Sequence, residues 1–209
     1  MTGSGVAAPR QIAELWFDPS CPYTWVTSRW LLEVATVRPV TIRWRVMSLS
    51  VLNEGRDDDP EGDPEGYLWG PVRIFAAVGQ RYGQEALGRL YTAYGQRVVA
   101  TGDWTATPAA LADAGLPPEL AEVAGSTAYD DLVRGSHEEG IGLVGRHAGT
   151  PVIATTVDGR RIAFFGPVLS RVPRGERAGR LWDGTLLVAG EPGFHELKGP
   201  PHAEPDLAG

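Results

Sequence analysis

The sequence of 209 residues predicts an α/β fold in which an all-helical subdomain interrupts a small sheet. Three observations predict it. Residues 12–46 have the pattern of a strand, a helix and a second strand, whereas residues 71–146 keep a helical spacing of apolar side chains throughout. Strand patterns then return over residues 152–165 and lead into a last helical pattern. The predicted order is therefore βαβ, a helical insertion, and ββα.

The first βαβ unit is predicted from side-chain periodicity. Residues 12–17 form a short apolar run rich in strand-forming residues, and residues 40–46 alternate between apolar and polar, running on into Met47-Ser48-Leu49 as a half-buried strand. Between them, apolar residues recur at helical spacing over residues 24–37, and Pro22 suits a first helical position. Functional groups are expected at the carboxyl end of the first strand, because open α/β sheets place their sites there.

Residues 54–66 break this pattern with two prolines and three glycines, and predict a solvated, mobile loop or a lid. The acidic residues in it do not predict a calcium site, because the prolines break the alternation of ligands that such a loop needs. Residues 71–146 predict four or five helices. The dipeptide Asp158-Gly159 predicts a tight hairpin turn, residues 174–188 a last helix, and the final twenty residues an extended or frayed tail.

Composition narrows the functional classes. A formal charge of −7 without a basic stripe argues against nucleic acid as a partner, and no apolar run approaches the length of a membrane span. Residues 1–10 lack the apolar core of a signal peptide. A single cysteine cannot form an intramolecular disulfide and fits a reducing compartment, so we expect a cytoplasmic protein.

That one cysteine, Cys21, lies where the first strand turns into the first helix. Cysteines at helix N-termini commonly have pKa values of roughly 3.5–7.5, because unpaired backbone N–H groups and the helix dipole favour the thiolate. The alternative is a buried, inert cysteine, which is the usual case for a lone cysteine in a cytoplasmic protein. The position favours a reactive thiol with a lowered pKa.

Several segments together resemble a known family. They are Phe17-Asp18-Pro19-Ser20-Cys21-Pro22-Tyr23, Thr27-Ser28-Arg29-Trp30, Val46-Met47-Ser48-Leu49, Leu52-Asn53-Glu54, Trp69-Gly70-Pro71-Val72-Arg73, Gly149-Thr150-Pro151 and Phe164-Phe165-Gly166-Pro167-Val168-Leu169-Ser170. In this order they resemble the DsbA-like branch of the thioredoxin fold, and in particular the mycothiol-dependent nitroreductase and disulfide-reductase family of mycothiol-using bacteria. The resemblance implies a thioredoxin-like domain over residues 11–65 and 148–190, an inserted helical subdomain over 66–147, and an extended C-terminal tail over 191–209.

The resemblance also implies a monothiol mechanism. Thioredoxin-like proteins carry a Cys-x-x-Cys pair at this turn, but here Thr24 replaces the second cysteine. A hydroxyl cannot resolve a mixed disulfide, so an external thiol must do so, and the family names mycothiol. Substrates would be small disulfides, mycothiolated proteins or nitroaromatic electrophiles. Thr24 either donates a hydrogen bond to the Cys21 thiolate or is merely a tolerated polar residue of the first helical turn.

Further site residues are carried over from the same family. Pro151 matches the cis-proline that faces the cysteine in thioredoxin-like folds, and Thr150 before it would offer its backbone to an extended thiol substrate. Pro22 and Tyr23 flank the cysteine, with Tyr23 expected to be exposed. Asn53 and Trp69 would border the cleft and bind the thiol or the substrate; alternatively, they are a strand-end cap and part of the core.

Neither a metal nor a nucleotide is expected. His137 and His147 are isolated and predicted to be surface or capping residues, and no glycine-rich phosphate loop follows a strand. Two other functions stay open. Cys21-Pro22-Tyr23 resembles the Ser-Pro-Tyr turn of kappa-class glutathione transferases and related isomerases, in which Cys21 would activate a bound thiol. The third possibility is a redox-inactive binding scaffold. The sequence leaves the oligomeric state open.

Overall fold

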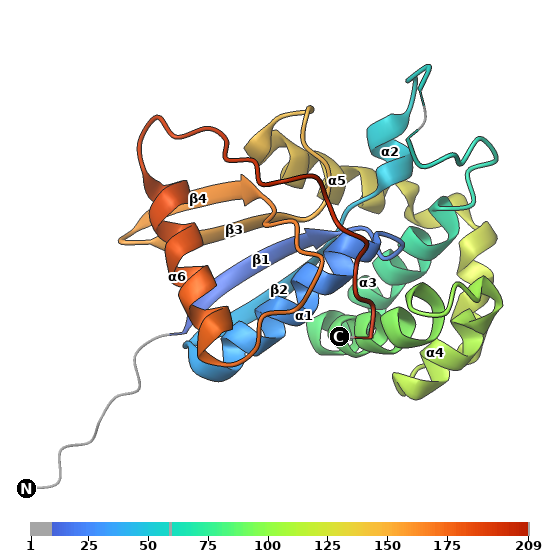
Figure 1. Cartoon of the computed structure of the whole chain (residues 1–209). Coiled ribbons are helices and arrows are strands. Elements are labelled where there is room, and N and C mark those ends of the chain that lie inside the picture. The colour runs from blue at the N-terminus through green and yellow to red at the C-terminus, as the bar shows by residue number, and fades with distance from the viewer. Residues whose placement is uncertain (1–9, 59, 209) are drawn as a thin grey trace, which may run out of the picture.

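A mixed four-stranded sheet with the strand order β2-β1-β3-β4 forms the centre of the computed structural model (Figure 1). The structure describes residues 10–58 and 60–208, so the predicted absence of a signal peptide over residues 1–9 and one acidic residue of the loop, Asp59, lie outside it. The strands are β1 (Gln11–Phe17), β2 (Val40–Val46), β3 (Val152–Val157) and β4 (Arg160–Phe165). β1 pairs with β2 in parallel and with β3 antiparallel, and β4 pairs antiparallel with β3.

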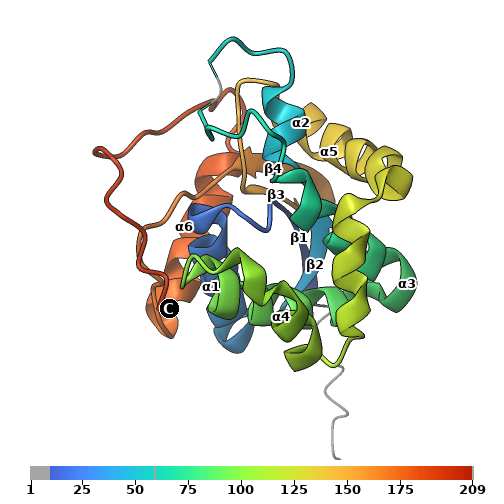
Figure 2. The ribbon, with the colours of Figure 1, turned by 90° about the vertical axis from the view of Figure 1, so that its right-hand side faces the viewer.

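Helices cover both faces of this sheet (Figure 2). α1 (Pro22–Val37) and α6 (Glu176–Gly190) pack together on one face, while α3 (Trp69–Tyr94) and α5 (Asp130–Val144) lie on the other. The βαβ unit, the helical insertion and the ββα unit follow one another as predicted. The hairpin between β3 and β4 turns at Asp158 and Gly159, whose φ angles of 50° and 78° lie in the left-handed region that such residues tolerate.

The helical insertion is less regular than its sequence pattern predicts. Gly83, at φ 79°, bends α3 between the two predicted helical segments. α3 leads into a π-helix, η1 (Gly95–Val99), and α4 (Thr107–Asp113) follows. Three short 3₁₀ elements complete the insertion: η2 (Trp104–Ala106), η3 (Pro118–Gly125) and η4 (Thr127–Tyr129).

Aromatic side chains join the sheet to both helical layers. Tyr91 of α3 stacks on Phe17 at 4.1 Å between ring centroids and meets the edges of Trp25 and Trp44 at 5.7 and 5.6 Å. Burying each such ring contributes on the order of 1.5–3 kcal/mol. Because Trp25 lies one turn after Cys21, this cluster also sets the position of the start of α1.

Two sequence-based expectations about local structure are wrong. The second strand does not continue through Met47-Ser48-Leu49, because Ser48 is the N-cap of a short helix, α2 (Leu49–Asn53), and its hydroxyl accepts from Val51 N–H at 3.2 Å. His137 is not a surface residue: it is 1% exposed, and its Nδ1 accepts a hydrogen bond from Ser48 N–H. α5 packs against the sheet, and that packing buries the histidine.

The segment after α6 has no helix or strand and is largely exposed, but residues 202–207 near its end contact the rest of the chain. It runs back across the N-terminal end of α1 (Figure 1). Leu207 packs against the main hydrophobic core, and Asp206 N–H donates to Ser170 O at 2.8 Å. Within the described part of the chain, no helix is long and apolar enough to cross a membrane.

Candidate active site

Three segments that are distant in sequence meet at one edge of the sheet. β1 ends there and leads into the turn 18–21, β2 ends there and leads into α2, and the antiparallel β3 begins there after residue 151. Trp16 pairs with Val152, and Met47 N–H donates to Phe17 O at 2.9 Å. The parallel and antiparallel pairings of β1 therefore bring α2 and residues 149–151 next to the cysteine turn.

Cys21 is the N-cap residue of α1, with Pro22 in the first turn. Its backbone N–H donates to Asp18 O at 3.2 Å, and its carbonyl accepts from Trp25 N–H at 3.0 Å. The Cys21 side chain makes no capping hydrogen bond, but the backbone N–H groups of Tyr23 and Thr24 and the Thr24 hydroxyl act to lower the pKa of its thiol. These are the unpaired donors that an N-terminal helical turn offers, so the arrangement around Sγ is the one expected.

The expected low pKa of Cys21 is wrong for this structure. Cys21 is 8% exposed, and burial raises the pKa of its thiol to about 11. The donor groups of Tyr23 and Thr24 lower the pKa, but removing the sulfur from water outweighs them. A negative charge on Asp18 raises the pKa further. At neutral pH, Cys21 in this conformation is a thiol and not a thiolate.

Asp18 organises the cysteine turn from inside the protein. It is fully buried; one carboxyl oxygen accepts from Ser20 N–H and the other from Leu49 N–H, each at 2.8 Å. Burial raises the pKa of this carboxyl to about 7, even though both hydrogen bonds lower it. Asp18 thereby joins the turn to the start of α2. Asp18 belongs to the motif around Cys21, but the sequence alone did not predict a role for it in the site.

Thr150 lies directly beside the turn. The Thr150-Pro151 peptide bond is cis. The Thr150 hydroxyl accepts from Asp18 N–H and donates to Trp16 O, both at 3.3 Å, and lies 3.1 Å from the Thr24 hydroxyl. A second cis bond, Gly166-Pro167, was not predicted, and the Thr27 hydroxyl donates to Pro167 O at 2.8 Å.

Tyr23 does not have the exposure that the sequence predicts. Its ring is half-buried beneath the C-terminal tail, 5.4 Å from the ring of His202, and its hydroxyl donates to Ala203 O at 3.3 Å. The tail therefore covers one side of the first turn of α1. The sequence offered no signal for this contact beyond the apolar residue near the end of the tail.

A buried arginine behind the cysteine was also missed. Arg29 lies two helical turns after Cys21, stacks on the Trp25 ring at 4.0 Å, and is 7% exposed. It donates to the Ser28 and Thr92 hydroxyls and forms no ion pair within the described residues. Burial lowers its pKa to about 10. Burial also raises the pKa of the Tyr91 hydroxyl, and the charge of Arg29 opposes that rise.

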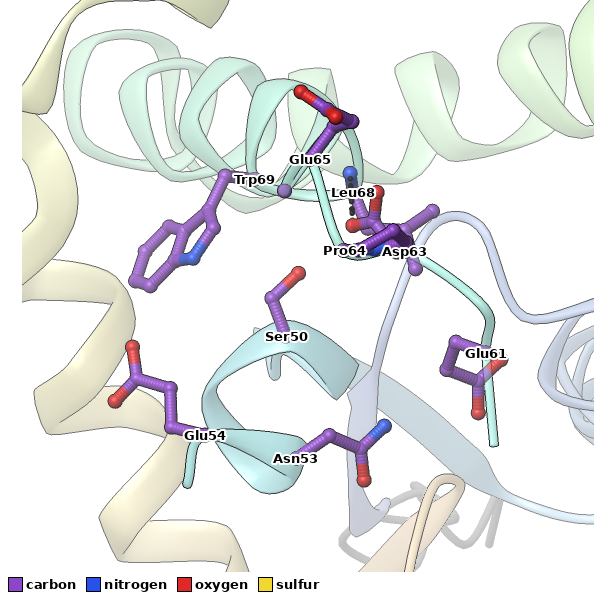
Figure 3. A pocket seen from close by; sticks show the side chains of 10 residues that line it. Ser50, Asn53, Glu54, Glu61, Asp63, Pro64, Glu65, Leu68 and Trp69 are labelled. Carbon is purple, nitrogen blue, oxygen red and sulfur yellow. Dashed lines mark hydrogen bonds between the residues drawn. The ribbon is translucent and has the colours of Figure 1, made fainter. Parts of the chain in front are cut away.

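Asn53 and Trp69 lie in a separate pocket next to the cysteine turn, residues 18–21 (Figure 3). The pocket has a volume of about 320 Å³, with Ser50 and Asn53 of α2 on one side and Pro64 and Trp69 on the other. The amide oxygen and nitrogen of Asn53 and the hydroxyl of Ser50 are inaccessible to water and have no hydrogen-bond partner among the residues described. The site residues thus form two groups, one at Cys21 and one at Asn53, which α2 connects.

Two arginine side chains lie close to the Trp69 ring. The guanidinium groups of Arg73 and Arg134 lie 5.1 and 5.0 Å from its ring centroid, and Arg134 also pairs with Glu54 at 2.6 Å. His137 and His147 are not part of this arrangement. Residues 10–58 and 60–208 contain no group of three His, Cys, Asp or Glu side chains placed to hold a metal ion.

Comparison with known proteins assigns the family. The model of the Rv2466c-like family, described as mycothiol-dependent nitroreductase Rv2466c, matches residues 20–199. The chain belongs to this family. It is also 33% identical over 192 residues to the uncharacterized protein Rv2286c of Mycobacterium tuberculosis, a match that covers 88% of this chain and 80% of that protein.

Solved structures confirm the predicted thioredoxin fold with its helical insertion. A probable DsbA oxidoreductase, SCO1869 from Streptomyces coelicolor, has a TM-score of 0.54 at 17% identity, covering 91% of this chain and all of that one. A 2-hydroxychromene-2-carboxylate isomerase has a TM-score of 0.52 at 16% identity, covering 84% and 93%. Since oxidoreductases and an isomerase share the fold, the fold alone does not select the reaction.

Proposed function

We propose that the protein is a thiol-disulfide oxidoreductase that works by monothiol exchange at Cys21, with mycothiol as the external reductant. Its substrates are small disulfides, mycothiolated proteins or nitroaromatic electrophiles. The observation that carries the proposal is the placement of Cys21 at the N-terminus of α1, where the Thr24 hydroxyl and the N–H groups of Tyr23 and Thr24 act to lower the pKa of its thiol. Family membership over residues 20–199 supports it.

The exchange on a disulfide follows from these groups. The Cys21 thiolate attacks one sulfur of the substrate, whose S–S bond breaks; one half binds Cys21 as a mixed disulfide and the other leaves as a thiolate. The N–H groups of Tyr23 and Thr24 stabilise negative charge on Cys21 Sγ before this attack and again when Sγ is released. Mycothiol, when bound, supplies the second thiolate, which takes the substrate half from Cys21 and restores the reduced protein.

The pocket beside the turn suits the hydroxyl-rich part of mycothiol. Asn53 offers a buried donor and a buried acceptor without partners among the described residues, and Ser50 offers a hydroxyl. These atoms are inaccessible to water as the chain stands, so a ligand reaches them only when the Asn53 and Ser50 side chains turn toward the pocket. Hydrogen bonds formed there would recover the cost of leaving such groups unpaired, on the order of 1–3 kcal/mol each. Sugar and inositol hydroxyls both donate and accept, and the face of Trp69 provides an apolar wall for a ring.

Intact-mass measurement tests the proposal. Brief exposure of the reduced protein to mycothiol disulfide should add one mycothiol per chain, and added mycothiol should remove it. The Cys21→Ser variant should show no adduct and no turnover while its thermal unfolding stays unchanged. Turnover of Cys21→Ser at the wild-type rate would disprove the exchange mechanism.

The burial of Cys21 favours one second candidate function. A thiol whose pKa is raised to about 11 stays protonated at neutral pH and donates an S–H hydrogen bond. In that role, Cys21 would activate the thiolate of a bound cofactor, as in kappa-class-like thiol transferases and isomerases. The same mass experiment separates the two functions, because the second requires tight thiol binding without a covalent adduct. Absence of both the adduct and the binding would favour a redox-inactive scaffold.

A further inference from the structure

Carboxylates surround the pocket that contains Asn53 and Trp69. Of the 10 described residues that line this pocket, none is basic and four are acidic: Glu54, Glu61, Asp63 and Glu65. Glu54 lies at the end of α2, and the other three lie on the segment that leads to α3 (Figure 3). The acidic side chains thus come from two segments on different sides of the cavity, and a ligand in the pocket lies between their negative charges.

The guanidinium groups near the pocket are already paired with carboxylates. Arg134 bonds both carboxyl oxygens of Glu54, at 2.6 and 2.7 Å, and Arg73 bonds both carboxyl oxygens of Asp130, at 2.7 and 2.9 Å. Bidentate pairs of this kind fix the geometry of the guanidinium group. An anionic ligand would have to break one of these pairs to gain a cationic partner, so the pocket gives such a ligand no ready counter-charge.

The start of α3 would suit an anion, but a side chain of the chain itself occupies it. The N-terminal N–H groups of a helix and the positive end of its dipole attract negative groups. The two carboxyl oxygens of Asp63 accept from Tyr67 N–H at 2.7 Å and from the N–H of Leu68, the N-cap of α3, at 2.9 Å. Asp63 therefore satisfies donors that an external carboxylate or phosphate would otherwise bind.

The charge of the pocket acts on the cysteine turn. Asp18 in that turn accepts from Leu49 N–H at 2.8 Å, and the next residue, Ser50, lines the pocket. Cys21 N–H donates to Asp18 O at 3.2 Å. Burial raises the pKa of the Asp18 carboxyl, and the negative charge of Glu61 raises it further. A disulfide that reacts at Cys21 therefore does so in the electric field of the pocket.

We propose that Glu61, Asp63 and Glu65 select the external thiol by charge, admitting an uncharged, hydroxyl-rich thiol and repelling an anionic one such as glutathione. The inference rests on the proposed function, because it requires a small thiol to exchange at Cys21. Each half of glutathione disulfide has two carboxylates and one ammonium group, whereas mycothiol has hydroxyl groups and no ionised group outside its thiol. Like charge slows the approach of the anionic disulfide, and salt screens this repulsion.

Rates of adduct formation on Cys21, followed by intact mass, test the proposal. The reduced protein is mixed with mycothiol disulfide, glutathione disulfide or the small neutral hydroxyethyl disulfide, and the first two rates are divided by the third to remove changes in the thiol itself. In every case the thiolate attacks one sulfur, and the other half leaves as a thiolate. The double variant Glu61→Gln/Glu65→Gln should raise the glutathione ratio about fivefold and leave the mycothiol ratio unchanged. Asp63 is kept because it bonds the start of α3.

A matched control separates the pocket from the overall charge of the protein. Asp57→Asn/Glu191→Gln removes the same charge at exposed positions outside the pocket and should keep both wild-type ratios. Salt should raise the glutathione ratio of the wild type and have less effect on Glu61→Gln/Glu65→Gln.

The possible failures are distinct. A glutathione ratio that is unchanged in Glu61→Gln/Glu65→Gln, or that rises equally in the control, would overturn charge selection while exchange with mycothiol disulfide stands. Absence of an adduct with all three disulfides would overturn the proposed function, and this inference with it. Glu65→Lys reverses one charge at an exposed position and should by itself raise the glutathione ratio, so the test does not depend on the double variant.

Discussion

The hydroxyl groups of Thr24 and Thr150 lie 3.1 Å apart in the interior beside Cys21, although 126 residues separate them in the chain. Thr150 also donates to Trp16 O, and the Thr24 hydroxyl also acts to lower the pKa of the Cys21 thiol. Each hydroxyl has one proton. When Thr150 donates its proton to Thr24, the Thr24 proton is free for Cys21; when Thr150 donates to Trp16, Thr24 can donate to Thr150 instead. The pair therefore couples the segment before β3 to the thiol.

The first prediction concerns the Thr24 hydroxyl. Thr24→Val keeps the shape but removes the donor to Cys21, so we expect the thiol pKa to rise by about one unit and alkylation at fixed pH to slow about tenfold. The pH dependence of the iodoacetamide rate measures this. Thr24→Ser keeps the hydroxyl and should behave like the wild type. If the Val and Ser variants react equally, the hydroxyl does not act on the thiol.

The second prediction uses the buried carboxyl of Asp18, whose pKa rises from 3.8 to about 7 on folding. The folded state then binds a proton more tightly than the unfolded state, so this contribution to stability is complete below pH 3.8 and is lost as the pH rises through about 7. The loss amounts to about 4 kcal/mol, since one pKa unit corresponds to 1.36 kcal/mol.

Urea unfolding at pH 5 and pH 7.5 measures the part of this loss that falls between these two pH values, about 2.5 kcal/mol. Asp18→Asn should remove most of the decrease in the free energy of unfolding between these two pH values. The exposed Asp113, whose pKa is lowered by its bond to Arg97, provides the control, because Asp113→Asn should leave the decrease as it is in the wild type. An undiminished decrease in Asp18→Asn would mean that another group titrates there.

The third prediction concerns the close approach of η1 to α1. A Cβ at Gly95 would lie 2.0 Å from the Trp25 ring, so Gly95→Ala should destabilise the protein by about 3 kcal/mol or more and disturb the turn that carries Cys21. Gly135→Ala in α5 meets no atom within 4 Å and should leave stability unchanged or raise it by about 0.5–1 kcal/mol. Thermal unfolding of the two variants checks both; equal midpoints would contradict the close contact.

The fourth prediction addresses the pocket at Asn53. Asn53→Ala removes two buried polar atoms that lack partners in the described structure, so the free energy of unfolding should not fall. If Asn53 binds the external thiol, KM for mycothiol should rise about fivefold to tenfold while the alkylation rate of Cys21 stays the same. Gln80→Ala, at an exposed position of α3, is the control. An unchanged KM would assign Asn53 a structural role only.

The elements of the sheet and the two helices of its α1–α6 layer could be predicted because their signals are local. Alternation over residues 40–46, the Asp158-Gly159 turn and a proline after Cys21 each depend on neighbours within a few positions. The prediction that the second strand continues through Ser48 was wrong. Its strand-like neighbours concealed a cap, and β2 ends three residues earlier than its apolar pattern predicts, because the Ser48 hydroxyl bonds Val51 N–H.

The candidate site, too, could be predicted where its signals are local in sequence and could not where they depend on tertiary contacts. The resemblance to the family predicted Cys21, Thr24 and Thr150-Pro151 as site residues, and the order of the strands brings these segments to one edge. It did not identify Arg29, whose role depends on Trp25 and on Thr92 of another helix, 63 residues away. Nor did it show that Asp18 bonds the start of α2, because that contact exists only once β1 and β2 are paired.

The sequence by itself determined the order of strands and helices, the family, and the single sulfur at a helix N-terminus. Only the tertiary structure decided the state of that sulfur. Helix donors next to Cys21 in sequence lower its pKa, whereas burial by segments that fold over it raises the pKa to about 11. The tail that touches Tyr23 lies 180 residues away along the chain. Desolvation depends on every segment that packs around a group, and local sequence patterns do not show which distant segments those are.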